Sequence, residues 1–130
     1  MKKLVLLCLA LGALLLAACG GGGGGTTSVV TNCSPSGPHL SVTAKNIQFD
    51  TTCLAAPAGR PFTIAFHNQD SGTTHNVAIY TDASVTKALF QGKLVAGVAT
   101  ETYDVPALPA GRYYFRCDVH PQMNGTFNVK

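Results

Sequence analysis

Charge of either sign is scarce in this sequence. Only 12% of the 130 residues are charged, with nine Lys and Arg against six Asp and Glu. Lys2 and Lys3 supply two of the nine cations, so from Cys19 onward seven cations face six anions. A nucleic-acid partner requires a basic surface that neutralises phosphates. The near balance of charge therefore predicts no nucleic-acid binding.

The sequence also lacks an apolar run long enough to cross a membrane as a helix, which takes about 20 residues. Its longest run, Leu4 to Ala18, follows two lysines and ends in small residues, which is the layout of a secretory signal peptide. Leu16-Ala17-Ala18-Cys19 resembles the bacterial lipoprotein cleavage box. The resemblance implies that residues 1–18 are removed and that Cys19 is multiply acylated, which anchors a chain stably. An ordinary signal peptide with an incidental cysteine is the alternative.

Helical periodicity is missing from the rest of the chain. Residues 19–31 contain six consecutive glycines and are expected to form a flexible tether. Residues 32–130 are expected to form one domain. Its β-prone stretches lie at 40–44, 47–49, 62–66, 75–79, 102–105, 113–117 and 125–129. Residues 81–91 do not alternate and could hold a turn of helix. Short strands with turn residues between them predict an all-β antiparallel sandwich or barrel of seven or eight strands.

The cysteines divide into groups by their expected fate. Cys8 leaves with the signal peptide and Cys19 is the lipidation site, which leaves Cys33, Cys53 and Cys117. Export implies an oxidising compartment in which disulfides persist. Cys33 and Cys53 can pair with each other. Cys117 is then an odd thiol, and metal ligation is one reason to retain it.

A potential metal-binding motif surrounds this odd thiol. Cys117, His120 and Met123 follow one another at intervals of three on a predicted loop, and Pro121 would stiffen that loop. His75 stands 42 residues before Cys117, at the start of a predicted strand. Two imidazoles, one thiolate and a weak axial thioether form the ligand set of blue-copper electron-transfer sites. His39 and His67 are predicted to be solvated and inert.

The chain resembles the cupredoxins, and most closely the amicyanin and pseudoazurin type, including halocyanin-like lipoproteins. The resemblance lies in Phe62 to Asn68 with His75-Asn76-Val77, and in Gly111 to Gly125. It implies a Greek-key β-sandwich that holds one Cu(I)/Cu(II) ion through Nδ1 of both histidines and transfers single electrons. From the signal peptide and the lipoprotein box we expect a location outside the cytoplasm, in the periplasm or on the outer face of the cell membrane, and we expect a monomer. The implied partners are redox proteins such as a cytochrome or a copper oxidoreductase.

One residue departs from the family pattern. Asp118 follows Cys117, where better-known members often carry a small hydroxyl or neutral residue. The sequence therefore does not decide whether the side-chain hydrogen bond that usually ties the two ligand loops is present. A bond from Asn76 to Asp118 is a possible substitute.

Two other functions compete with electron transfer. A copper storage or delivery protein usually has exposed Met-rich or His-rich sites, whereas the mature chain has only Met123 and four histidines. Multicopper enzymes of this fold need further histidine clusters, and a binuclear centre needs a second cysteine in the ligand loop; both are missing. The sequence therefore predicts an electron carrier that is not an enzyme.

Overall fold

The computed structural model describes residues 31–130. The predicted signal peptide, Cys19 and all of the predicted tether except Thr31 lie outside the described residues. The described part is built from strands, and no helix in it could cross a lipid bilayer. Its ten strands are β1 (His39–Ala44), β2 (Cys53–Ala56), β3 (Phe62–Asn68), β4 (Thr74–His75), β5 (Ala78–Tyr80), β6 (Ala88–Gln91), β7 (Val95–Ala96), β8 (Ala99–Val105), β9 (Gly111–Arg116) and β10 (Asn124–Val129).

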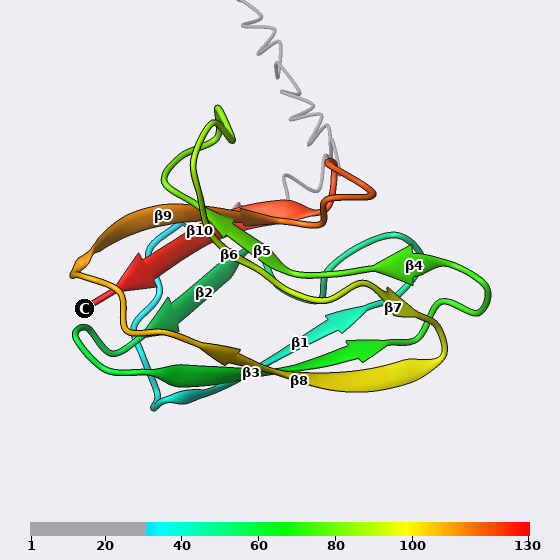
Figure 1. Ribbon diagram of the computed structural model, residues 1–130, viewed down its shortest axis with the longest axis horizontal. Helices are drawn as coiled ribbons and strands as arrows, with labels where there is room; N and C mark the ends of the chain where they lie inside the picture. Colours follow the sequence, from blue (N-terminus) through cyan, green and yellow to red (C-terminus); the bar gives the residue numbers. More distant parts are fainter. Residues whose placement is uncertain (1–30) are drawn as a thin grey trace, which may run out of the picture.

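Two sheets lie face to face and confirm the predicted all-β sandwich (Figure 1). One sheet has the strand order β2-β10-β9-β5-β6 and the other has the order β1-β3-β8. A separate short pair, β4 with β7, lies at one end. Most pairings are antiparallel, but β1 pairs with β3, and β2 with β10, in parallel.

Alternating apolar side chains fill the space between the sheets. Phe62, Ile64 and Phe66 of β3 are buried, while the residues between them are half-buried, as the sequence pattern predicts. Phe62 stacks on Phe127 of β10 with ring centroids 5.5 Å apart, which joins the two sheets. A fully buried side chain of this size contributes about 1.5–3 kcal/mol relative to exposure. This rigid core is the scaffold for the loops at either end.

Three local expectations need correction. Residues 47–49 form no strand; only Phe49 bridges Ala44, and Asn46 and Ile47 adopt positive φ values of 54° and 56°. Residues 81–91 hold turns and the strand β6 rather than a helical turn. Residues 75–80 are all buried, so the predicted alternation is absent there; the chain passes from the β4–β7 pair into β5, which lies between β6 and β9.

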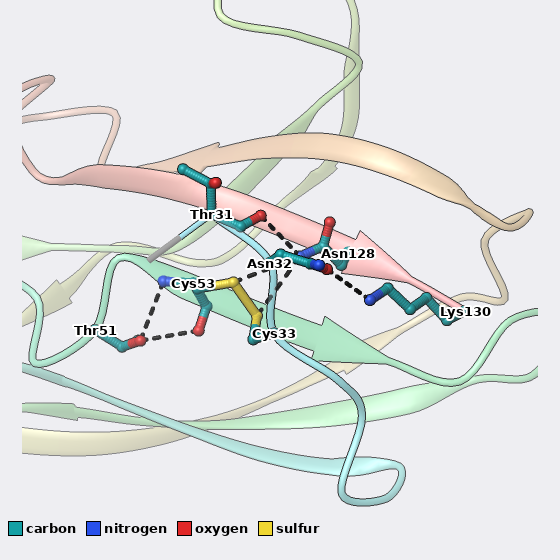
Figure 2. Close-up of a disulfide and its surroundings, with 7 residues drawn as sticks. All are labelled: Thr31, Asn32, Cys33, Thr51, Cys53, Asn128 and Lys130. Carbon is teal, nitrogen blue, oxygen red and sulfur yellow. Dashed lines mark hydrogen bonds between the residues drawn. A yellow bond between two sulfur atoms is a disulfide. The ribbon is translucent and has the colours of Figure 1, made fainter. Parts of the chain in front are cut away.

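The predicted disulfide between Cys33 and Cys53 is present (Figure 2). The Asn128 side-chain amide of β10 donates to both sulfurs, at 3.6 Å and 3.4 Å, and to the Thr31 carbonyl at 3.2 Å. Lys130 adds a bond to the Asn32 side chain. These contacts fasten the segment that leads from the predicted tether to the edge of the five-stranded sheet.

Candidate metal centre

His75 is held by the short strand pair at one end of the sandwich. Strand β4 ends at His75, which lies opposite Val95 of β7. The His75 side chain is fully buried. Its Nε2 atom lies 2.9 Å from a carboxylate oxygen of Asp70, so its Nδ1 atom is the nitrogen left to face the rest of the centre.

Cys117, His120 and Met123 come from the loop that joins β9 to β10. The Cys117 backbone N–H donates to the Met123 carbonyl at 2.9 Å, and the Met123 N–H donates to the His120 carbonyl at 2.9 Å. The Asn124 side chain donates to the Pro121 carbonyl at 2.8 Å, and Pro121 itself is exposed. These bonds close the loop into tight turns, which places the Cys117 and Met123 side chains in the core.

The two histidines and the thiol converge from segments far apart in sequence. Nδ1 of His75 lies 3.1 Å from Nδ1 of His120 and 3.7 Å from the Cys117 sulfur. The ligating atoms of all three residues lie within 4.8 Å of one another. Among residues 31–130, no other group of three or more His, Cys, Asp or Glu side chains comes this close together.

This donor set fits one soft or borderline metal ion. Metal–nitrogen bonds of about 2.0–2.1 Å and metal–sulfur bonds of about 2.3 Å, the values for zinc, are short enough for one ion to reach atoms at these separations. One thiolate with two imidazoles is the trigonal donor set of blue-copper sites. Cys117 is also a free, fully buried cysteine, so disulfide formation does not compete for its sulfur.

A polar network ties the His75 segment to the loop after β9. The Asp118 backbone N–H donates to Asn76 Oδ1 at 2.8 Å, and Asn76 Nδ2 donates to Asp118 Oδ2 at 3.0 Å. The bond considered from the sequence is therefore present, and it is reciprocal. Tyr80 donates its hydroxyl to Asp118 Oδ1 at 2.6 Å. Burial raises the pKa of Asp118, but the bonds from Tyr80, Asn76 and Gln91 outweigh burial and lower the pKa below its ordinary value.

Asp70 and Tyr80 are the contacts that the sequence did not predict. Asp70 lies in a polar stretch that reads as an ordinary turn, where aspartate is common for local reasons. Tyr80 continues a buried run and reads as core. The spacing of five residues between Asp70 and His75 was the available signal for Asp70, and it is too common to identify a partner.

The two remaining histidines of the domain lie apart from the cluster. His39 is exposed and bonded to the Thr63 hydroxyl. His67 is half-buried and bonded to the Thr100 hydroxyl. Both contacts are local sheet contacts, in keeping with the expectation that neither histidine is a ligand.

A family model described as a cupredoxin-like domain matches residues 8–129. The chain therefore belongs to the cupredoxin-like family, as the sequence resemblance predicted. A comparison with curated proteins finds no match.

Solved structures agree on the fold. Auracyanin from the photosynthetic bacterium Roseiflexus castenholzii, reduced with dithionite, is 19% identical with a TM-score of 0.64, covering 72% of this chain and 97% of that one. Auracyanin A, a "blue" copper protein from Chloroflexus aurantiacus, is 20% identical with a TM-score of 0.63, covering 72% and 99%. A mutant of amicyanin in its reduced Cu(I) form is 23% identical with a TM-score of 0.53, covering 71% and 82%. At these identities the likeness shows the shared fold alone.

Proposed function

We propose that this protein is a one-electron carrier in which His75, Cys117, His120 and Met123 hold a single copper ion. The convergence of two imidazoles and one thiol within 4.8 Å at one end of the sandwich carries the proposal. Copper bound there would supply a Cu(I)/Cu(II) couple. The axial role of Met123 is supported by its burial in the same core cluster as Cys117 and by its backbone bonds within the loop.

The protein's part in this function is to keep the donors in place and away from water. His75 and Cys117 are fully buried, so solvent does not reach the donor atoms freely. The reciprocal bonds between Asn76 and Asp118 hold the two ligand-bearing segments together, and Pro121 limits the backbone freedom of the loop. A site held in this way reorganises little when the oxidation state changes, which favours rapid electron transfer.

The route to a redox partner is supported by the surface near His120. His120 is half-buried, and its neighbour Val119 is 44% exposed. Ile47, Leu94 and Val98 are the other exposed large apolar residues of the described chain, and they lie in the loops beside Asp70, β7 and β8. Exposed apolar side chains near a metal centre suit contact with a protein partner. We infer a redox protein as the partner, such as a cytochrome or a copper oxidoreductase.

The proposed location is extracytoplasmic, with a lipid anchor on Cys19. The signal-like run of residues 1–18, the lipobox-like Leu16 to Cys19 and the tether of residues 19–31 support this location. A monomeric domain of residues 32–130 at the end of that tether could reorient towards a partner. This arrangement suits a carrier that works beside a membrane.

Visible absorption of the copper-loaded protein tests the proposal. Cys117→Ser should abolish the intense thiolate-to-copper band, because a hydroxyl cannot supply that charge transfer. His67→Ala is the matched control, since it removes a histidine outside the cluster, and it should keep the band. A Cys117→Ser protein that stayed deep blue would refute the ligand assignment. Rapid copper exchange in the wild type would favour storage or delivery instead.

A further inference from the structure

Asp70 connects three parts of the chain through one carboxylate. One oxygen accepts the backbone N–H of Asn46, and the other accepts the Ile47 N–H at 2.8 Å and lies 2.9 Å from His75 Nε2. The side chain is 12% exposed and the His75 side chain is fully buried. The contact with His75 is thus largely shielded from water, where a charge-assisted bond is stronger.

The surroundings fix Asp70 from several sides. Its backbone N–H donates to the Asn68 side chain at 3.0 Å. Gly97 lies so close that a Cβ there would stand 2.1 Å from the Asp70 carbonyl oxygen. Each of the two carboxyl oxygens accepts a backbone N–H, one from Asn46 and the other from Ile47. This donor arrangement is that of a carboxylate, which can only accept a hydrogen bond.

This acceptor determines where the imidazole protons lie. Nε2 of His75 must carry the proton that Asp70 accepts, so in a neutral His75 the Nδ1 atom has a free lone pair. Nδ1 of His120 stands 3.1 Å from that lone pair. In the metal-free neutral pair, the proton between the two rings therefore belongs to His120. The geometry leaves Nδ1 of His75 ready to bind a metal, with no change of tautomer.

We propose that Asp70 is the positioning residue of the metal centre, fixing the orientation and tautomer of His75 and placing a negative charge behind it. This proposal rests on the proposed copper function only where it concerns the effect of the Asp70 charge on the bound metal. An outer-shell carboxylate makes the imidazole a stronger donor, and the loss of such a partner typically costs about 10- to 100-fold in metal affinity. The charge should stabilise Cu(II) more than Cu(I), and so lower the reduction potential.

The first arm of the test uses the metal-free protein and ¹⁵N NMR of the histidine rings. In the wild type, His75 should be protonated at Nε2 and His120 at Nδ1. Asp70→Ala should leave His75 as a mixture of tautomers, because no acceptor remains. Asp70→Asn should keep the Nε2–H tautomer, since its amide oxygen can still accept. A His75 that stays fully in the Nε2–H form in a folded Asp70→Ala protein would overturn the proposal.

The second arm measures the reduction potential of the copper-loaded proteins. Asp70→Asn should raise the potential, by about 59 mV for each tenfold preferential loss of Cu(II) affinity. Asp50→Asn is the matched charge control, because Asp50 accepts the Thr43 N–H and makes no hydrogen bond or ion pair with the cluster. A shift in Asp70→Asn no larger than that in Asp50→Asn would overturn the role of the charge, even if Asp70→Ala fails to fold. If the wild type bound no copper, the proposed copper function would be refuted. The NMR measurement on the metal-free protein would still test whether Asp70 positions His75.

Discussion

Asp118 is the residue on which most of the contacts around the centre converge. It accepts hydrogen bonds from Tyr80 and Asn76, and Gln91 approaches it at 3.3 Å. Arg116 lies 3.6 Å from it and also stands over the Tyr80 ring. A single side chain next to Cys117 thus joins β5, β6 and β9 to the His75 segment. Because several buried partners share it, its removal should leave more than one polar group unsatisfied.

Asp118→Ala should lower the free energy of unfolding of the metal-free protein by about 2 kcal/mol, since Tyr80 and Asn76 lose their acceptor. Denaturant unfolding at pH 7 measures this loss. The lowered pKa of Asp118 also sets a pH window. Its contribution to stability is fully present above the unfolded-state pKa of 3.8 and is lost as the pH falls through the lower folded-state value, so the stability difference between the two proteins should shrink as the pH falls below 3.8.

Asp104→Ala is the control for this prediction. Asp104 is an exposed carboxylate on β8, so its removal should change the stability by less than about 0.5 kcal/mol. An Asp118→Ala protein as stable at pH 7 as the Asp104→Ala protein would show that the network contributes nothing to the fold.

At the scale of elements, the edge strand β2 depends on a covalent link. It pairs in parallel with β10 along four residues and has no strand on its other side. The disulfide from Cys53 of β2 to Cys33 joins this edge to the segment before β1 (Figure 2). The link closes a sequence separation of 20 residues. It therefore restricts the unfolded chain as well as the folded edge.

The double substitution Cys33→Ala and Cys53→Ala should cost about 3 kcal/mol of unfolding free energy in the chain-entropy account. The copper spectrum should stay unchanged, because neither cysteine belongs to the cluster. Urea unfolding and visible absorption measure the two effects. A loss of the visible band in the folded variant would mean that the link reaches the metal centre, and a cost below about 1 kcal/mol would contradict its structural role.

At the scale of the whole molecule, the centre and the proposed anchor have separate tasks. The β4–β7 pair lies at the end of the sandwich where β3 ends (Figure 1), and His75 of the cluster is the last residue of β4. The disulfide-linked segment is bonded to Asn128 of β10, and Cys53 pairs with Thr126 of the same strand. Because Cys19 is not among the proposed ligands, changes at the predicted lipidation site should alter where the protein resides and leave its spectrum intact.

Cys19→Ser should move the protein from the membrane fraction to the soluble fraction of expressing bacteria, because the acyl chains provide the attachment. Cell fractionation with immunodetection measures the shift. Cys8→Ser is the matched control, since Cys8 lies within the predicted signal peptide, and it should remain with the membranes. Membrane association unaffected by Cys19→Ser would contradict the lipoprotein interpretation.

The parts of this protein that could be predicted from sequence are those recorded by local pattern. Alternation in Phe62 to Phe66 predicted a half-buried strand, and the cysteine inventory allowed the pairing of Cys33 with Cys53. The spacing of Cys117, His120 and Met123 fits one loop because only a few residues separate them. Patterns of this kind depend on neighbours along the chain, so one sequence is enough to read them.

The tertiary structure alone decided the contacts between distant segments. It placed Asp70 behind His75, ordered Asn46 and Ile47 around the same carboxylate, and gathered Tyr80 and Gln91 on Asp118. It also buried residues 75–80 on both faces, against their expected alternation. A sequence lists donors and acceptors but not which of them share a location, because that depends on how the two sheets and their loops pack in three dimensions.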